Sequence, residues 1–213
     1  MVAFRTALCA ASAASILAST AYAETKSWDL TGFDGVKSTS GVDVIVEVGP
    51  DYSIELETEG DFDTARVEVK GDTLILGRES RGMRLNFGRS ARFVYRVTLP
   101  ELTHAGSSAG SDLRISGIDG GDIELSSSSG SDLEAEGSCD SLDADASSGA
   151  DLMAFDLECA DVRAEASSGS DIEVTATRSI KARASSGADI TVRGKPERRD
   201  TKASSGGSVR FRD

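Results

Sequence analysis

The sequence is poor in the residues that build most enzyme active sites and large cores. It contains one histidine, one tryptophan, three prolines and three cysteines, and aromatic residues are 5% of its 213 residues. A single histidine excludes multi-histidine metal sites and leaves little scope for acid–base catalysis near neutral pH. Aromatic rings are too few to fill a core along the whole chain. Glycine, serine and acidic residues are abundant instead.

The charge is also one-sided, with 36 Asp and Glu against 23 Lys and Arg and a formal net charge of −13. An acidic surface repels nucleic acids and anionic membranes, so neither is expected as a partner. Beyond the first residues, no stretch is apolar over the ~20 residues that a membrane-spanning helix needs. We therefore expect a mature chain with no membrane span and no nucleic-acid partner.

Residues 1–23 have the three parts of a secretory signal peptide. Arg5 supplies a positive charge, a stretch rich in Ala, Ile and Leu follows, and Ala21-Tyr22-Ala23 has the small side chains of a cleavage site. The alternative, a membrane span, requires a longer and more apolar run. We predict a mature chain of residues 24–213 that is exported to the periplasm, the outer surface or the medium.

Residues 24–103 show the period-two alternation of β-strands. Val42, Val44, Val46 and Val48 alternate with other residues until Pro50 ends the run. Similar short runs, bounded by Gly, Pro or Asp, cover residues 53–58, 65–69, 73–76 and 93–99. Seven of the nine aromatic residues of the mature chain lie in this half. The pattern predicts an irregular β region able to bury large side chains.

Residues 104–213 are a repeat of the pattern Ser-Ser-Gly-x-Asp-[Leu/Ile]. Its glycines are separated by 18 to 20 residues and are Gly110, Gly130, Gly149, Gly169, Gly187 and Gly206. An earlier copy occupies residues 38–44. A sustained period near 20 with two or three short strands in each repeat is typical of a solenoid.

Residues at odd offsets from each repeat glycine are apolar, and those at even offsets are mostly polar. Stacked coils would therefore bury aliphatic columns in a narrow interior, where alanine fits and rings do not. The predicted fold is all-β: a right-handed parallel β-helix with coils of ~20 residues, preceded by the irregular region 24–103. We treat residues 24–213 as a single domain.

Cys139 and Cys159 each lie ten residues before a repeat glycine, so they occupy equivalent positions on adjacent coils. Adjacent strands lie about 4.8 Å apart, within the Cα separation that a disulfide requires. Export to an oxidising compartment would allow the bond to form. We predict a Cys139–Cys159 disulfide, and the alternative is two free buried thiols.

One polar column has two interpretations. It lies two residues after each repeat glycine and contains Asp112, Asp132, Asp151, Asp171 and Asp189, with Asp43 as the upstream equivalent. In the first interpretation, each aspartate caps its turn through an Asx hydrogen bond. In the second, the row binds Ca²⁺, which prefers carboxylate and carbonyl oxygens. No other cofactor is expected.

The sequence offers little to support catalysis. His104 is the only candidate base, and we expect it at the surface. The pattern G-x-S-x-G occurs once, at residues 106–110 (GSSAG), but it lies inside the β-type repeat and not in the strand–turn–helix setting of a nucleophile elbow. No metal cluster, phosphate loop or cofactor fingerprint occurs. Parallel β-helices include polysaccharide-cleaving enzymes, but this repeat offers only Phe155 and Phe211 as sugar-stacking rings. We predict that the protein is not an enzyme.

The chain resembles a known bacterial family, the "putative auto-transporter adhesin, head GIN domain" proteins. The resemblance rests on residues 33–36 (FDGV), 41–46 (GVDVIV), 71–76 (GDTLIL) and 97–102 (VTLPEL), followed by the Ser-Gly-x-Asp-Leu repeats. It implies an exported β-solenoid with no assigned catalytic residues.

The combined expectation is a non-enzymatic exported protein of the cell envelope that acts in adhesion or as a scaffold. Its partner would be a protein or glycan of the envelope or of a host surface. A periplasmic binding or sensing module is the first alternative, and a carbohydrate-active β-helix enzyme is the second.

Overall fold

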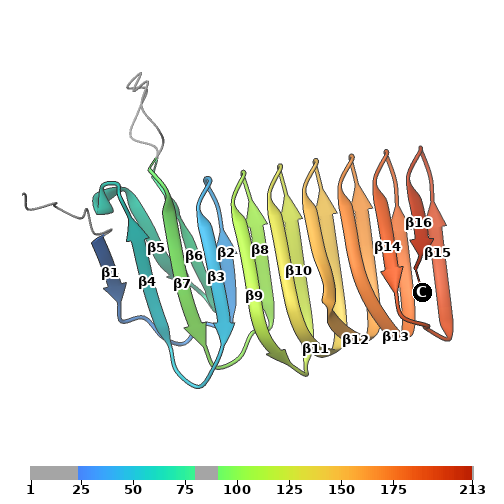
Figure 1. Ribbon diagram of the computed structural model, residues 1–213, viewed down its shortest axis with the longest axis horizontal. Coiled ribbons are helices and arrows are strands. Elements are labelled where there is room, and N and C mark those ends of the chain that lie inside the picture. Colours follow the sequence, from blue (N-terminus) through green and yellow to red (C-terminus); the bar gives the residue numbers. More distant parts are fainter. Residues whose placement is uncertain (1–23, 80–90, 213) are drawn as a thin grey trace, which may run out of the picture.

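The computed structural model describes residues 24–79 and 91–212, so the predicted signal peptide lies outside the described residues. The strands form a long rod of two facing layers that meet at turns along both edges (Figure 1). We call the layer that contains β3 and β9 the first face and the layer that contains β2 and β8 the second face. Both run the length of the rod, and the core lies between them.

The N-terminal end is a curled, mixed sheet. On the first face, β1 (Glu24–Trp28), β4 (Ser53–Thr58) and β7 (Phe93–Leu99) pair antiparallel, and β7 pairs parallel with β3 (Asp43–Val48). On the second face, β5 (Ala65–Lys70) pairs antiparallel with β6 (Thr73–Arg78), which pairs parallel with β2 (Gly35–Ser38). A short 3₁₀ turn, η1 (Phe62–Thr64), precedes β5.

The repeats then stack as parallel coils. Their strands are β8 (His104–Ser108), β9 (Asp112–Asp119), β10 (Asp122–Ser128), β11 (Asp132–Ser147), β12 (Asp151–Ser167), β13 (Asp171–Ala184), β14 (Asp189–Arg193), β15 (Arg198–Ala203) and β16 (Ser208–Phe211). The long strands β11, β12 and β13 pass around a corner and so contribute to both faces. The predicted all-β solenoid with coils of about 20 residues is confirmed.

The upstream copy of the repeat is the first coil of the stack. β2 pairs with β8, and β3 pairs with β9 with Asp43 opposite Asp112. The chain leaves this coil after β3, builds β4 to β7, and returns at β8. The solenoid therefore begins at residue 35, although the regular repeat is visible in the sequence only from residue 104.

The predicted aliphatic columns form the core. Leu113, Leu133, Leu152 and Ile172 are consecutive register partners, and each is at most 1% exposed. On the second face, Ala144, Ala164 and Ala182 make an equivalent column of small side chains. The aromatic residues gather at the N-terminal end, where Phe33 and Tyr95 are buried.

The Ser-Gly corners are left-handed turns. At the fourth turn of the stack, Ser148 and Gly149 have φ of +59° and +68°, and the other corners repeat this conformation. Two consecutive residues with positive φ match the twist of the flanking strands, as in two-residue hairpin turns. Glycine adopts this conformation at little cost, whereas the preceding serine does not.

The last coil closes the rod, and Val209, the register partner of Ile190, is its contribution to the core. Arg199 takes the register position held by Ile180 on the coil before it, and its guanidinium lies 4.2 Å from the ring centroid of Phe211. All six residues of β15 are exposed. An inward position given to a charged residue protects an open sheet end against further strand pairing.

Within residues 24–79 and 91–212, no helix has the length and apolar character to cross a bilayer.

Candidate functional site

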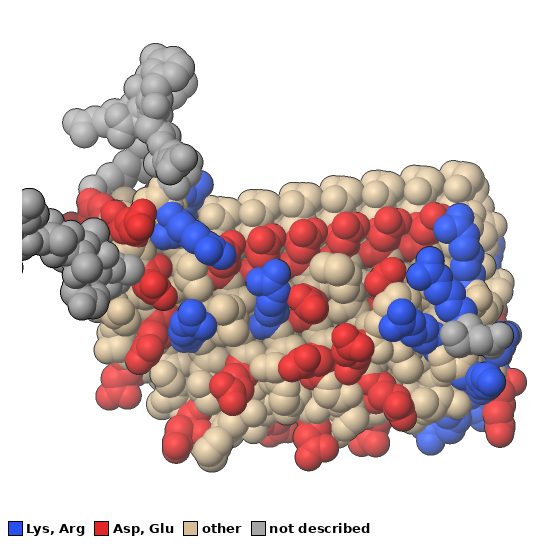
Figure 2. All heavy atoms as spheres, viewed as in Figure 1, with Lys and Arg blue, Asp and Glu red and all other residues tan. Residues whose placement is uncertain are grey.

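The aspartate column predicted from the repeat is a continuous row on the first face. Six carboxylates occupy the same register position on consecutive coils: Asp43, Asp112, Asp132, Asp151, Asp171 and Asp189. Figure 2 shows them as a line of acidic side chains directly below the row of turns. A seventh coil ends the row, because Ser208 is the register partner of Asp189.

The carboxylates of the column affect one another. Partial burial, followed by the charges of Asp43 and Asp132, raises the pKa of Asp112. Burial and the neighbours Asp171 and Asp132 raise the pKa of Asp151 in the same way. Within the described residues, ion pairs to the column lie at its two ends, where Arg92 contacts Asp43 at 2.6 Å and Arg210 contacts Asp189 at 3.2 Å. Arg114 and Arg92 offset part of the rise in the pKa of Asp112, and the middle of the column remains predominantly acidic.

The predicted Asx caps are wrong: at Ser131 and Ser170 the serine before the aspartate holds the turn instead, and alanine takes that position before Asp151 and Asp189. Ser170 is fully buried; its hydroxyl accepts from the Ser167 N–H (3.2 Å) and donates towards the carbonyl oxygens of Ser167 and Ala146, both at 2.9 Å. Ser131 makes the equivalent bonds on an earlier coil. Across the described residues, no carboxylate of the column bonds the backbone of its own turn. Asp112, Asp132 and Asp171 thus remain available to a partner, whereas Asp43, Asp151 and Asp189 already bond a neighbouring group.

The straight row of carboxylates offers few ligands to any single calcium ion. Neighbouring carboxylates lie one strand spacing apart, about 4.8 Å, in a straight line. A cation between two of them would meet two carboxylates, whereas Ca²⁺ takes six to eight oxygen ligands. Calcium binding by Asp112, Asp132, Asp151, Asp171 and Asp189 stays a prediction, and a melting temperature that is equal in excess calcium and in chelator would refute it.

The structure corrects the expected position of His104, whose side chain is only 23% exposed. Its Nε2 atom lies 2.7 Å from the Thr73 hydroxyl, and its Nδ1 atom lies 3.0 Å from the Thr103 hydroxyl. The ring lies over Gly35, the register neighbour of both Thr73 and His104. Sequence reasoning missed this cluster because its three strands are about 30 to 70 residues apart in the chain.

The same histidine belongs to the cluster of possible metal ligands found in the described part of the chain, with Asp34 and Asp72. Each carboxylate lies 3.9 Å from a different ring nitrogen. The Thr73 hydroxyl bonds both Nε2 and, at 3.1 Å, an oxygen of Asp72, so it already links these two groups. Asp34 Oδ1 is buried and has no hydrogen-bond partner in the described chain.

Cys139 and Cys159 are register partners on β11 and β12, with their Cα atoms 4.5 Å apart, and their sulfurs are bonded. The disulfide lies at the corner where the chain passes from the first face to the second. It joins two central coils across a sequence separation of 20 residues.

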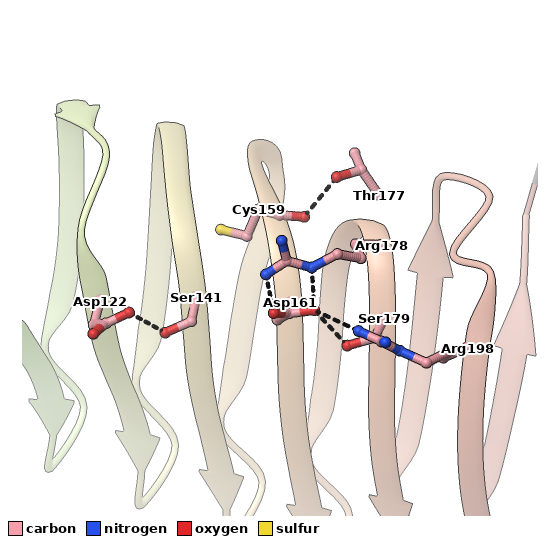
Figure 3. A network of polar contacts seen from close by, with 8 residues as sticks. All are labelled: Asp122, Ser141, Cys159, Asp161, Thr177, Arg178, Ser179 and Arg198. Atoms are coloured by element: carbon pink, nitrogen blue, oxygen red, sulfur yellow. Dashed lines mark hydrogen bonds and ion pairs between the residues drawn. The ribbon is translucent and has the colours of Figure 1, made fainter.

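Polar contacts between coils line this corner of the second face (Figure 3). Asp161 on β12 accepts from Arg178 and, at 2.6 Å, from the Ser179 hydroxyl, and it lies 3.8 Å from Arg198 on β15. These bonds hold the pKa of Asp161 well below its usual range, the largest contribution coming from Arg178. At the same register position on the two preceding coils, the Ser141 hydroxyl donates to Asp122 at 2.6 Å.

Outward side chains of the second face pair charges between coils. Asp143 contacts Arg163 on the next coil at 3.6 Å. Asp200 instead contacts Arg183 at 3.0 Å, although Lys181 is its register partner. The diagonal contact of Asp200 with Arg183 forms in place of the direct one with Lys181, because arginine is longer and can offer two donors to a carboxylate.

A shallow groove of about 630 Å³ lies at the corner between β9 and β10. Its apolar lining comes from Val48, Pro100, Leu102 and Ile118, and its polar rim from residues 119–122. Neither His104 nor Thr73 lines it. The groove could hold a small ligand, but it contains none of the residues considered for catalysis.

The fold and the surfaces define an all-β solenoid whose polar groups serve contacts between coils and a charged face. A family profile described as "Putative auto-transporter adhesin, head GIN domain" matches residues 32–196. The chain belongs to this family. No curated protein matches it.

Solved structures share the fold at low identity. A putative adhesin from Bacteroides fragilis is 16% identical with a TM-score of 0.69, and the match covers 89% of this chain and 96% of that one. A putative adhesin from Parabacteroides merdae is 13% identical (TM-score 0.55), with coverage of 91% and 98%. A putative lipid binding protein from Parabacteroides distasonis is 16% identical (TM-score 0.52), again with 91% and 98%. At these identities the likeness concerns the fold alone.

Proposed function

We propose that the mature chain is a non-enzymatic, exported protein of the cell envelope that acts by binding, in adhesion or as a scaffold. The aspartate column carries the proposal, because six carboxylates repeat at one register position on a flat face. A regular row suits a repetitive partner, a protein or glycan of the envelope or of a host surface. The family description, which names an adhesin, supports the same role.

The arrangement around His104 supports a non-enzymatic role. Its two ring nitrogens bond threonine hydroxyls, and the carboxylates of Asp34 and Asp72 lie 3.9 Å away. Thr73 is 9% exposed and already contacts Asp72, so its hydroxyl is poorly placed to meet a substrate. A carbohydrate-active enzyme is therefore not proposed.

A second candidate is a periplasmic binding or sensing module, which the groove beside β9 and β10 favours. Its apolar floor and carboxylate rim could take a small amphipathic ligand. The name of the Parabacteroides distasonis relative, a putative lipid binding protein, is consistent with such a ligand.

Location and binding are tested separately. Protease added to intact cells should remove the protein if it is displayed at the surface, and should spare it if it is periplasmic. Loss of the protein only after the outer layer is opened would favour the binding module over the adhesin. Detection of the protein with uncleaved residues 1–23 in the cytoplasm would contradict both.

Binding is tested by pull-down from an envelope extract with the mature chain. The variant D132N/D151N/D171N removes three central charges of the column and should lower retention of the partner roughly tenfold. The matched control E136Q/D156N/E158Q removes three exposed charges of the same coils outside the column. Equal loss in both variants would show that net charge, not the column, is recognised.

A further inference from the structure

The charge of the rod is strongly segregated along its axis. Residues 104–177 contain 17 Asp and Glu against two Arg and no Lys. Residues 178–212 contain ten Lys and Arg against three Asp and Glu. In Figure 2 the basic side chains gather over the C-terminal coils, while acidic side chains dominate the rest of the first face. The chain as a whole is acidic, but its C-terminal end is a basic surface.

The cations of the last coil lie on several sides of the rod. Lys195 is in the corner between β14 and β15, Lys202 is on the second face, and Arg212 follows β16 on the first face. All three are exposed, and none of them forms an ion pair within the described residues. Four other arginines of this end are compensated by Asp161, Asp189 or Asp200: Arg178, Arg183, Arg198 and Arg210.

The end of the rod also offers backbone donors and an aromatic ring. β15 pairs only with β13 and β16 only with β14 in the described chain, so each presents one open edge. Open edges expose N–H groups that can donate to phosphate oxygens. Phe211 is 38% exposed among these cations, and an aromatic ring beside basic residues suits a membrane–water interface.

We propose that the C-terminal end of the rod, the basic tip formed by residues 193–212, docks on an anionic lipid surface. A plane that faces the end meets Lys195, Lys202 and Arg212 at once, whereas a linear polymer would follow one side of the rod. The acidic flank of residues 104–177 is repelled by the same surface. The rod therefore stands on its tip with the N-terminal end pointing away from the membrane.

This inference rests on the proposed function only for placing the protein in the envelope. It also limits what the net charge predicts: repulsion from anionic membranes applies to the flank and not to the tip. Lipid binding is measured with the purified mature chain, so its failure would leave the envelope location and the column as tested above unaffected.

The test is co-sedimentation with vesicles of phosphatidylcholine, with and without phosphatidylglycerol. We expect partition into the anionic vesicles only, weakening as salt rises, because each basic residue near the surface contributes about a fivefold factor. The variant K195Q/K202Q/R212Q should lower partition roughly a hundredfold. Its melting temperature should match that of the unaltered chain, since the three side chains make no ion pair.

The matched control is K26Q/K37Q/K70Q, which removes the same charge from exposed lysines at the opposite end. It should change partition only a few-fold. Equal loss in both variants, or no preference for anionic vesicles, overturns the proposal. So does binding of inorganic polyphosphate that outcompetes the vesicles, which identifies a soluble polyanion. Self-association that the tip variant abolishes in the absence of lipid assigns the surface to a second copy.

Discussion

At Gly35, the absence of a side chain leaves room for the imidazole of His104. A Cβ atom at this position would lie 1.9 Å from Nε2 of His104, too close for the ring to stay where it is. The bond between His104 and Thr73 depends on that space. One missing side chain on β2 thus positions a polar cluster shared by β2, β6 and β8.

We expect Gly35→Ala to expel the ring and to lower the free energy of unfolding by about 1–3 kcal/mol. Chemical denaturation of the variant measures the change. His104→Ala is the matched control, because G35A/H104A should lose little more than H104A alone. Additive losses would contradict the coupling between the two positions.

The sequence predicted the positions of some of these residues and not of others. The period of the repeat predicted that Leu133 and Ala144 are buried, and the spacing of Cys139 and Cys159 predicted their disulfide. His104 could not be placed, because its contacts join strands with no shared pattern in the sequence. Ser131 and Ser170 were visible in the repeat, but the sequence did not show that these inward-facing serines, and not the adjacent aspartates, bond the backbone of the turn.

At the scale of the elements, contacts between neighbouring coils distinguish one register from another. Asp161 is the clearest case, since it joins β12 to β13 and β15 through three side chains (Figure 3). The paired aliphatic columns tolerate any shift by a whole coil, but this mixed column of acid, hydroxyl and arginine does not. Its function is to specify which coil lies next to which.

We expect Asp161→Asn to lower the melting temperature at pH 7. The pKa of Asp161 is depressed in the folded state, so its stabilising contribution is present above the unfolded value of about 3.9 and is lost as the pH falls below it. The difference between variant and unaltered chain should therefore disappear in acid. Asp156→Asn, an exposed change on the same strand, is the control, and a pH-independent difference would contradict the assignment.

The disulfide between β11 and β12 should contribute about 2–4 kcal/mol, because it closes a loop of about 20 residues. Cys139→Ser with Cys159→Ser should lose this amount in denaturation, and reduction of the unaltered chain should reproduce the loss. Thiol titration of the denatured, unreduced mature chain should find no free thiol. Two free thiols would restore the alternative of unpaired cysteines.

At the scale of the whole molecule, the two ends of the rod are built differently from its middle. The N-terminal end is closed by the curled sheet of β1 and β4 to β7, and the C-terminal end by Arg199 and Phe211. The repeat predicted the middle coil by coil. It carried no signal for the curled sheet at the N-terminal end, and the basic tip becomes visible only when the charges of each segment are counted separately.

Phe211→Ala should uncover the last apolar positions of the core and promote aggregation on heating. Met153→Ala is a matched control, since Met153 is also 38% exposed but lies on a central coil. Light scattering during a thermal ramp should rise earlier for F211A than for M153A. Equal behaviour of the two variants would show that Phe211 does not close the end.

The first coil has a consequence for the order of folding. Its two strands are complete by Val48, yet their neighbours β8 and β9 begin at His104 and Asp112. Closing contacts across some 70 residues is slow, whereas each later coil needs only the coil before it. We expect the C-terminal repeats to gain hydrogen-exchange protection before β2 and β3 do. In a chain that is exported N-terminus first, β2 and β3 would then remain unpaired with β8 and β9 until most of the solenoid has crossed the membrane.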